Sequence, residues 1–466
     1  MLSLSSCREN YLYKDFQEIV TTAAMAPKVL AMPDRGGRVR KGREVWASLL
    51  EQGALFKRVG TVNWRVPPEP VTLLEGLLDE LRDIGPLVDR FLQAVDRHLG
   101  ASPFLRELLG FPACPEEENL WALGRGEALT FFRLDMTMAQ GTSLKLFEIQ
   151  VVMGGLGIAQ ALRSAYGPHP LLPGTAGLYE QAMKRRFIAW CRAHGLGPDP
   201  GLPLMAALGS SSSPYRHEHL VLARHLNALE LVVAPLGCVR ADPVDGLLLP
   251  DGRRPVLVHR LFRSPSLFRS APGRAAQILS AVSAGALCLA NPWKDFLEDK
   301  RVLALVHHPQ TRKEMSGDLS EQDWDRLAAL VPGTWLAEKE RIADLIGLPP
   351  SRRGYYLKKG RSFEGRQVID GYQLSPRQWE AACLRAREEG DWIVQESVHG
   401  PPWPLEYLDF ANQEIRTMKG YVRLSPFYFR AEDTTVRLGE VLLTAREEKS
   451  KVHGASDAIL VVPGAS

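Results

Sequence analysis

The chain has 466 residues, of which 45% are hydrophobic and 24% are charged, and its formal net charge is +3. That balance is typical of a globular protein and excludes an intrinsically disordered chain. A chain of this length has room for roughly two to four domains. Because the positive excess is so small, we expect neither nucleic acid nor a membrane surface as a partner.

The cysteines are scattered along the chain, and no pair of them has the C-x-x-C spacing of a zinc or redox site. So few thiols in so long a chain do not indicate a disulfide scaffold. The first residues lack the charged leader and apolar run of a signal peptide. The longest apolar run, near Ala281–Ala290, is about half the length of a membrane-spanning helix. We therefore expect a soluble protein in a reducing cytoplasm.

Residues 1–125 are expected to form a mostly helical N-terminal region. Leucines recur at helical spacing from Leu73 to Leu81, and a second apolar series runs from Val88 to Val95. The stretch Arg35–Arg43 is basic and contains glycine. We interpret it as a solvated loop in preference to a contact for an anionic partner.

Residues 126–200 begin with a change of period from helix to strand. Two alternating strands are predicted over Phe131–Thr137 and Leu144–Gln150, and Gln140-Gly141 between them is a hairpin signal. Helical patterns follow over Ile158–Tyr166 and Gly177–His194.

Residues 201–290 have the strand–loop–helix–strand order of a parallel α/β layer. Asp251-Gly252 predicts a hairpin between Gly246–Leu249 and Pro255–Leu261. The other elements expected here are strand Leu204–Leu208, loop Ser210–Ser213, helix Tyr215–Leu229, strand Leu231–Leu236, helix Gly273–Ala284 and strand Ala286–Ala290.

Residues 291–466 mix helices with strands. The elements expected in this part are helices Ala337–Ile346 and Pro376–Glu389, and strands Gly354–Lys358, Trp392–Val398 and Gly420–Phe427.

The two alternating strands after residue 126 place polar side chains on one face. Arg133, Asp135 and Thr137 share a face of the first strand, and Glu148 and Gln150 share a face of the second. A symmetric hairpin loop would put Arg133 opposite Glu148, and directly opposed residues point to the same face. A three-residue loop would break this alignment, so the expectation depends on register.

Two carboxylates and an amide oxygen are ligands suited to Mg²⁺ that carries substrate phosphates. An arginine beside them could stabilise charge on a transferring phosphoryl group. The alternative is a half-buried strand pair with one cross-strand ion pair. The hairpin alone favours this alternative.

Lysines, glycines and a short apolar strand form a second set of candidate residues. Lys300 lies at a helix start downstream of Asn291-Pro292. Lys358 ends a strand before the turn Gly360–Gly365, where glycines let backbone N–H groups approach phosphate oxygens. The strand Trp392–Val398 could offer backbone groups to a purine edge. Taken singly, these segments also fit a basic surface hairpin and an ordinary core strand.

Together, these motifs resemble in their order the circularly permuted ATP-grasp enzymes, whose familiar members are the glutathionylspermidine synthetase-like ligases. The resemblance covers roughly residues 128–430. Gln150 departs from the family pattern, which has asparagine there. The motifs that carry the resemblance are Arg133-Leu134-Asp135, Glu148-Ile149-Gln150 with Gly154-Gly155, Asn291-Pro292 with Lys300, Lys358 with Gly365-Arg366, and Val394-Gln395-Glu396.

The resemblance implies a circularly permuted ATP-grasp fold of the α+β class, with a helical N-terminal region over residues 1–125. Residues 126–200 would be the first ATP-grasp segment with the metal-binding strands, 201–290 an α/β pre-ATP-grasp-like substrate-side domain, and 291–466 the nucleotide-binding lobes. It also implies ATP and Mg²⁺ as cofactors. The implied roles are metal binding by Asp135, Glu148 and Gln150, catalysis by Arg133 and Arg423, and ATP binding by Lys300, Lys358, Gly360, Gly365, Gln395, Glu396 and Val398.

The resemblance further implies carboxylate–amine ligation. A carboxylate attacks the γ-phosphorus of ATP, and an amine then displaces phosphate from the acyl phosphate to give an amide. The expected partners are a small carboxylate and a small amine, and the sequence carries no signal for an oligomeric state. The alternatives are an ATP-grasp kinase or non-amine ligase, and a catalytically silent nucleotide-binding scaffold, which Gln150 keeps open.

Two further motifs lie in the α/β layer. His217-Glu218-His219 lacks the H-E-x-x-H spacing of a metalloprotease, and we interpret it as an exposed helix start. The loop Ser210–Ser213 precedes that helix, and we interpret it as an N-cap loop in preference to an anion site.

Overall fold

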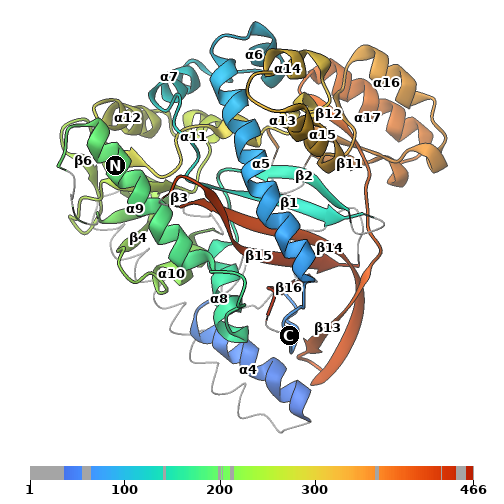
Figure 1. The fold of residues 1–466 in the computed structure, drawn as a ribbon, viewed down its shortest axis with the longest axis horizontal. Helices are drawn as coiled ribbons and strands as arrows, with labels where there is room; N and C mark the ends of the chain where they lie inside the picture. The colour runs from blue at the N-terminus through green and yellow to red at the C-terminus, as the bar shows by residue number, and fades with distance from the viewer. Residues whose placement is uncertain are drawn as a thin grey trace.

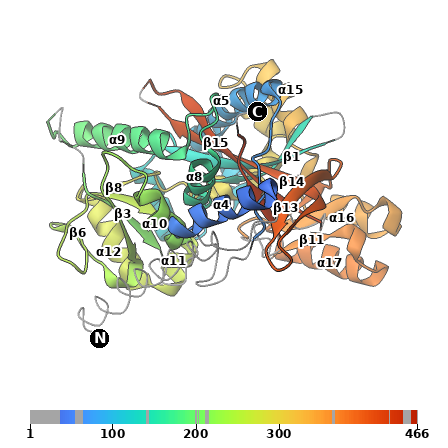
Figure 2. The ribbon, with the colours of Figure 1, turned by 90° about the horizontal axis from the view of Figure 1, so that it is seen from below.

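The computed structural model describes residues 36–54, 64–139, 143–197, 201, 203–209, 215–362, 367–431, 433–447 and 458–464. These residues form a central antiparallel sheet with a lobe on each side of it (Figure 1). One lobe is built on a parallel sheet and the other on a small antiparallel sheet. The view from below shows the same arrangement, with helices α10 and α12 in one lobe and α16 and α17 in the other (Figure 2).

The central sheet follows the order β16-β15-β14-β1-β2, and every neighbouring pair in it is antiparallel. The C-terminal part of β14 pairs with β1 and β15, while its N-terminal part pairs with β13. The strands are β1 (Phe131–Met138), β2 (Leu144–Gln150), β13 (Trp403–Asp409), β14 (Glu414–Arg430), β15 (Val436–Arg446) and β16 (Ile459–Val461).

The two faces of the central sheet are buried against different partners. Phe132 and Tyr428 share a core with helix α5 (Glu75–Leu99), whereas Phe131 and Phe427 share one with α8 (Leu156–Tyr166) and α9 (Thr175–Ala193). Helix α5 can approach closely because its Gly85 has no side chain: a Cβ there would lie 2.3 Å from the Tyr428 ring. The odd-numbered residues of β1 therefore face away from α5, toward the two lobes.

The parallel sheet has the order β4-β3-β7-β8, as the α/β pattern predicts. The hairpin predicted at Asp251-Gly252 is wrong: β6 pairs with β5, and β7 pairs in parallel with β3. The predicted loop Ser210–Ser213 lies outside the described residues. The elements of this lobe are β3 (Met205–Gly209), α10 (Tyr215–Ala223), β4 (Leu231–Pro235), β5 (Arg240–Asp242), β6 (Gly246–Leu248), β7 (Leu257–Arg260), α11 (Ser264–Ser270), α12 (Pro272–Ser283), β8 (Cys288–Leu289) and the 3₁₀ turn η3 (Leu236–Cys238).

The small antiparallel sheet has the order β11-β10-β12-β9 and packs on α16 and α17. Helix α17 has the predicted bounds because its ends are well signalled: Ser375 and Gln378 form a capping box, and Gly390 ends the helix in the left-handed conformation. The elements are β9 (Thr334–Leu336), α16 (Lys339–Ile346), β10 (Tyr355–Lys359), β11 (Val368–Asp370), α17 (Pro376–Glu389) and β12 (Trp392–Glu396), with the 3₁₀ turns η5 (Pro350–Arg352) and η6 (Gly371–Gln373).

The remaining helices join these sheets. The loop expected at Arg35–Arg43 is wrong, because most of this stretch belongs to helix α4 (Gly37–Glu51). Val39 and Arg43 are buried, and the helix contacts α8 and β13. Two basic residues of this helix form ion pairs with other parts of the chain: Lys41 with Glu69, and Arg38 with Glu406 of β13. The others are α6 (Pro103–Leu109), α7 (Pro115–Leu123), α13 (Arg301–Leu305), α14 (Pro309–Glu314), α15 (Glu321–Leu330) and the 3₁₀ turn η4 (Asp295–Glu298).

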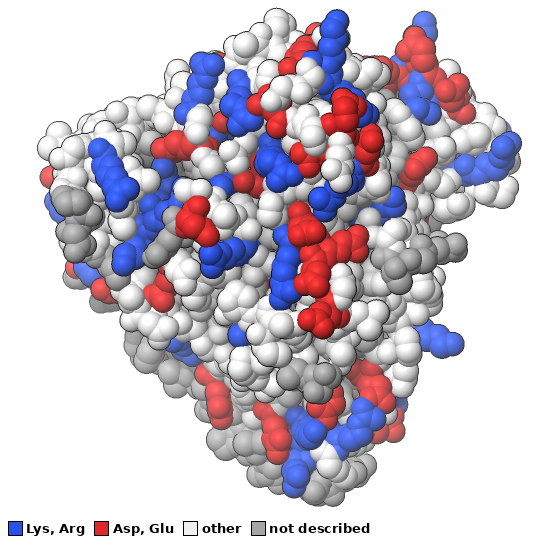
Figure 3. Space-filling view, viewed as in Figure 1, with Lys and Arg blue, Asp and Glu red and all other residues white. Residues whose placement is uncertain are grey.

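Charges of both signs are interspersed over the face that carries α5, as the small net charge leads one to expect (Figure 3). Within the described residues, every helix is too short or too polar to cross a lipid bilayer.

Candidate active site

The strands β1 and β2 bring the first candidate residues together, in a register that differs from the predicted one. Arg133 lies opposite Gln150, and Asp135 lies opposite Glu148, so the predicted pairing of Arg133 with Glu148 is wrong. The predicted turn Gln140-Gly141 lies outside the described residues. Since both observed pairs are directly opposed, the four side chains still share one face.

A β-bulge follows the pair formed by Asp135 and Glu148. The next pair is Met136 with Leu146, so β2 carries one extra residue, Phe147. A bulge re-aims the side chain of the extra residue. The Phe147 ring lies 5.3 Å from the Nζ of Lys358, which belongs to the small sheet. The bulge therefore forms part of the contact between the central sheet and the small sheet.

Asp135 is fully buried and holds two arginines. Its Oδ1 accepts hydrogen bonds from Arg133 Nε at 3.0 Å and from the Ser425 hydroxyl at 2.8 Å. Its Oδ2 accepts from Arg133 Nη2 at 3.0 Å, from Gln150 Nε2 at 3.3 Å and from Arg423 Nη1 at 3.4 Å. Burial acts to raise the pKa of the Asp135 carboxyl, but the charges of Arg133 and Arg423 outweigh it and hold the pKa below its usual value.

Glu148 faces a lysine that comes from a different part of the chain. Lys300 is the residue before helix α13, and its Nζ lies 3.5 Å from Glu148 Oε1 and 2.7 Å from the carbonyl oxygen of Ser362. The Lys300 side chain is 5% exposed, whereas that of Glu148 is 25% exposed. The carboxylate of Glu148 is thus open to solvent on one side and next to a buried cation on the other.

Lys358 is the second buried cation of the site. Its ammonium donates a hydrogen bond to Gln395 Oε1 at 2.6 Å, and Gln395 Nε2 donates onward to the Thr334 hydroxyl at 3.0 Å. Burial lowers the pKa of Lys358 to about 8, although the charge of Glu148 acts in the opposite direction. Lys358 and Lys300 therefore place two buried positive charges beside the edge strand β2.

The other predicted nucleotide residues lie at the ends of β10 and β12. Glu396 is exposed and accepts a hydrogen bond from the backbone N–H of Gly333 at 3.1 Å, and Val398 follows β12 and is half-buried. Gly360 is buried and does not face an open loop. A Cβ at this position would lie 2.5 Å from Asp299 Oδ1, so only glycine fits there. Gly365 lies outside the described residues.

A residue to which the sequence assigned no role, Asn291, joins the parallel sheet to the central sheet. It follows β8 with φ of 92°, and its Oδ1 accepts from the backbone N–H of Thr130 at 2.7 Å and of Phe131 at 3.2 Å. Its Nδ2 donates to the carbonyl oxygens of Phe131 at 2.9 Å and Val151 at 2.7 Å. The dipeptide Asn291-Pro292 was the available signal, since asparagine tolerates positive φ better than most residues.

The segment after β2 is held by two buried carboxyl groups. Glu298 accepts hydrogen bonds from the backbone N–H groups of Val151 and Val152, and Glu218 accepts from that of Gly155. The predicted helix start at His217-Glu218-His219 is confirmed by α10, but its predicted exposure is wrong, because Glu218 and His219 are 3% and 0% exposed. Helix α10 can approach because Gly157 has no side chain: a Cβ there would lie 1.7 Å from the Glu218 carbonyl oxygen.

Arg133 connects this segment to the site. Its Nη1 donates to the carbonyl oxygen of Gly154, while its other nitrogens bind Asp135. Burial raises the pKa of Glu218 to about 8, against the lowering effects of the Gly155 amide and the Arg133 charge. Glu218 thus holds the backbone at Gly155, next to the Gly154 carbonyl oxygen that binds Arg133. The pKa of this Glu218 carboxyl is raised well above its usual value.

We expect Glu218 and Glu440 to contribute less to the free energy of unfolding as the pH rises from about 5 to about 8. Burial raises the pKa of Glu218 to about 8 and that of Glu440 to about 7. Both values exceed those of the unfolded chain, so the native state is favoured while the groups are protonated and loses that advantage as they ionise. In urea unfolding across this pH range, the slope of the unfolding free energy against pH should be more negative in wild type than in E218Q, because E218Q removes the Glu218 contribution. The exposed Glu388 supplies the control, since E388Q should keep the wild-type slope. Equal slopes in E218Q and wild type would contradict the assignment.

The donor set fits a magnesium ion in part. In the described residues, no three His, Cys, Asp or Glu side chains gather as a metal site. Mg²⁺ is commonly bound by one or two carboxylates together with substrate phosphates. Glu148 and the amide oxygen of Gln150 fit that role, whereas Asp135 fits it after its two guanidinium partners have moved.

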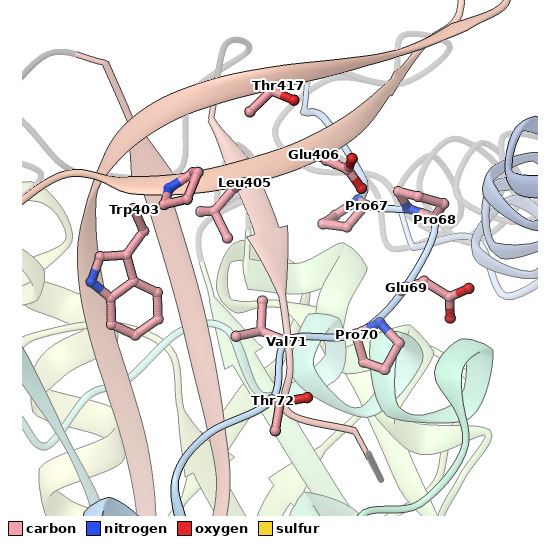
Figure 4. Close-up of a pocket in the computed structure, with 11 residues that line it drawn as sticks. Pro67, Pro68, Glu69, Pro70, Val71, Thr72, Trp403, Leu405, Glu406 and Thr417 are labelled. Carbon is pink, nitrogen blue, oxygen red and sulfur yellow. The ribbon is translucent and has the colours of Figure 1, made fainter.

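A cavity of about 540 Å³ lies elsewhere, between the segment 67–72 and strand β13. Figure 4 shows its lining, which includes Trp403, Leu405 and the prolines of that segment. None of the described candidate residues lines it.

The fold and the site define an α+β protein in which two buried lysines, an acidic strand pair and two arginines meet between the central sheet and the small antiparallel sheet. No family model and no curated protein matches the sequence. Among solved structures, the chain is similar to a glutathione synthetase-like effector from Globodera pallida in its apo form. The TM-score is 0.59 at 12% identity, covering 94% of this chain and 98% of that chain. At this identity the likeness shows a shared fold.

Two other solved structures are more distant. A putative gamma-glutamylcysteine synthetase from Methylobacillus flagellatus KT has a TM-score of 0.38 at 12% identity, over 79% of this chain and 86% of that chain. D-alanyl-alanine synthetase A from Vibrio cholerae has a TM-score of 0.27 at 11% identity, over 52% of this chain and 88% of that chain. These scores are too low to add to the argument from the first structure.

Proposed function

We propose that this protein is an ATP- and Mg²⁺-dependent carboxylate–amine ligase of the circularly permuted ATP-grasp type. The observation that carries the proposal is the pair of buried lysines, Lys300 and Lys358, beside the partly exposed Glu148. A buried ammonium is costly to a protein that makes no use of it, because its burial disfavours the charged form. Cations in this position suit the phosphates of a nucleotide.

In this proposal each group positions or neutralises charge. Lys300 and Lys358 bind the ATP phosphates, and Arg133 and Arg423 stabilise charge on the phosphoryl group in transfer. Glu148, Gln150 and Asp135 hold the Mg²⁺, which supplies charge neutralisation at the phosphates when bound. The adenine and ribose lie along β12, near Gln395, Glu396 and Val398.

The reaction needs no nucleophile from the protein. A carboxylate oxygen attacks the γ-phosphorus and ADP leaves, and an amine nitrogen then attacks the acyl carbon and phosphate leaves. The protein contributes by holding the reactants in line and by excluding water. The similar Globodera pallida structure is that of a glutathione synthetase-like protein, which supports a small amino-acid or peptide acid as the carboxylate substrate.

A hydroxylamine trap tests this function. The purified protein is incubated with MgATP, a pool of amino-acid and small-peptide carboxylates, and hydroxylamine as the amine, and hydroxamates are sought by mass spectrometry. We expect a hydroxamate whose formation falls about 100-fold or more in E148Q, because a metal- and phosphate-binding group has been neutralised. The exposed Glu414 lies in the same sheet, so E414Q should retain wild-type turnover.

The arginine contacts of Asp135 favour a second candidate function, nucleotide binding without turnover. Both its oxygens already accept hydrogen bonds from arginine. ATP binding without hydroxamate formation or ADP release would support this candidate over the ligase. ADP release without hydroxamate would instead support a kinase-like reaction.

A further inference from the structure

Three charged groups at the centre of the site contact one another, one carboxylate and two guanidinium groups. Asp135 receives a two-pronged contact from Arg133 and a third from Arg423, so one buried carboxylate serves two guanidinium groups. The side chains of Arg133, Asp135 and Arg423 are 8%, 0% and 14% exposed. Charge-assisted contacts in so dry a place are strong.

This arrangement conflicts with the work that both partners would do in the bound state. While Asp135 holds the arginines, its oxygens are closed to a cation. While Arg133 and Arg423 contact Asp135, their guanidinium groups bind a carboxylate and do not contact a phosphoryl group. Both requirements are met together if the carboxylate changes partners, because one exchange frees the cation ligand and both guanidinium groups.

The neighbouring ligands do not share this conflict. Glu148 is 25% exposed, and its contact with Lys300 is a long one, at 3.5 Å. Gln150 donates to Asp135 through Nε2 at 3.3 Å, which leaves its carbonyl oxygen out of that contact. A cation can therefore reach Glu148 and Gln150 first, directly beside Asp135 on the paired strand.

We propose that Asp135 is a latch which holds Arg133 and Arg423 until a cation takes over its carboxylate. The proposal rests on the ATP-dependent function proposed above. The latch makes the charge offered to phosphate depend on the metal: the protein binds ATP weakly without Mg²⁺, and its two arginines turn to the nucleotide when Asp135 has exchanged partners.

The test measures ATP affinity by titration calorimetry in EDTA and in excess Mg²⁺. Wild type should bind ATP much more weakly in EDTA. D135N removes the charge that holds the arginines, so it should bind ATP in EDTA about 5-fold or more tighter than wild type and lose most of the gain from Mg²⁺. S425A removes one neutral hydrogen bond to the same carboxylate and should stay within about 2-fold of wild type.

The outcomes separate the latch from the function. If wild type binds ATP under neither condition, the proposed function fails and the latch fails with it. If wild type binds MgATP but D135N binds ATP in EDTA no tighter than wild type, the latch alone is overturned.

A second variant covers the case in which D135N does not fold, which circular dichroism would reveal. R423Q leaves Asp135 with one cationic partner, so Mn²⁺ alone should bind about 5-fold tighter than to wild type, measured by electron paramagnetic resonance without nucleotide. Mn²⁺ binding that is unchanged or weaker in R423Q would overturn the latch.

Discussion

Replacement of Lys358 by methionine is expected to stabilise the protein while weakening ATP binding by about 10- to 100-fold. The Lys358 side chain is almost fully buried, between the rings of Phe147 at 5.3 Å and Tyr356 at 5.5 Å. Methionine has a similar length, packs well against aromatic rings and has no charge to desolvate, and we expect these gains to outweigh the loss of the hydrogen bond to Gln395. It cannot replace the charge-assisted contact with a phosphate, so stability and affinity should move in opposite directions.

The pH dependence sharpens this prediction. Burial lowers the pKa of Lys358 to about 8, below its value in the unfolded chain. Such a group contributes stability at high pH that is lost as the pH falls through about 8. The difference in melting temperature between K358M and wild type should therefore be larger at pH 7 than at pH 10.

The adjacent lysine provides the matched control. Lys359 lies on the other face of β10, where it pairs with Glu389 at 2.6 Å, and its side chain is 26% exposed. K359M should leave the ATP affinity within about 2-fold of wild type, because exposed ion pairs are weak and the residue faces away from the site. If K358M and K359M bind ATP equally well, Lys358 does not contact the nucleotide.

Replacement of Asn291 by alanine is expected to lower the free energy of unfolding by about 3 kcal/mol or more. The side chain makes hydrogen bonds to two backbone N–H groups and two carbonyl oxygens, all between the ends of β8, β1 and β2. Alanine would leave these groups buried without partners, and it would add strain at a φ of 92°. Urea unfolding followed by tryptophan fluorescence measures the loss.

Two further variants separate the causes. N291G removes the strain but not the lost hydrogen bonds, so it should recover about 1 kcal/mol of the loss and no more. The exposed Asn412 donates to Asp409 on the surface, and N412A should change stability by less than about 0.5 kcal/mol. An unfolding curve for N291A that coincides with that of wild type would show that the hydrogen bonds of Asn291 contribute little to stability.

The sequence predicts best those elements whose ends carry local signals. Helix α17 begins at Pro376 after Ser375 and ends before Gly390, and each of these residues has a local conformational reason to be there. The parallel sheet could likewise be predicted from strand–loop–helix–strand order. The alternation of Arg133 and Asp135 correctly placed both side chains on one face, since alternation depends on the strand alone.

Long-range packing is what the sequence does not contain. The register of β1 and β2 depends on a bulge at Phe147. The ring of Phe147 contacts Lys358 of the small sheet, which is far away in sequence. Glu218 looks like a surface residue because nothing near it in sequence shows that the N-terminus of α8 will cover it. The turn at Asp251-Gly252 is a sound local signal, yet β7 finds a partner in β3. In each case a tertiary contact overrides a local preference.

A fragment of this chain that began near residue 126 would keep every candidate nucleotide-binding residue and would still be a poor reagent. Helix α5 buries residues from Leu78 to Leu99 against the central sheet, in the same core as Leu134 and Tyr428. Without it, the part of that apolar face which α5 covers would meet water, and fragments with such surfaces associate with one another. Work on the site is therefore best done on a chain that retains the long helix.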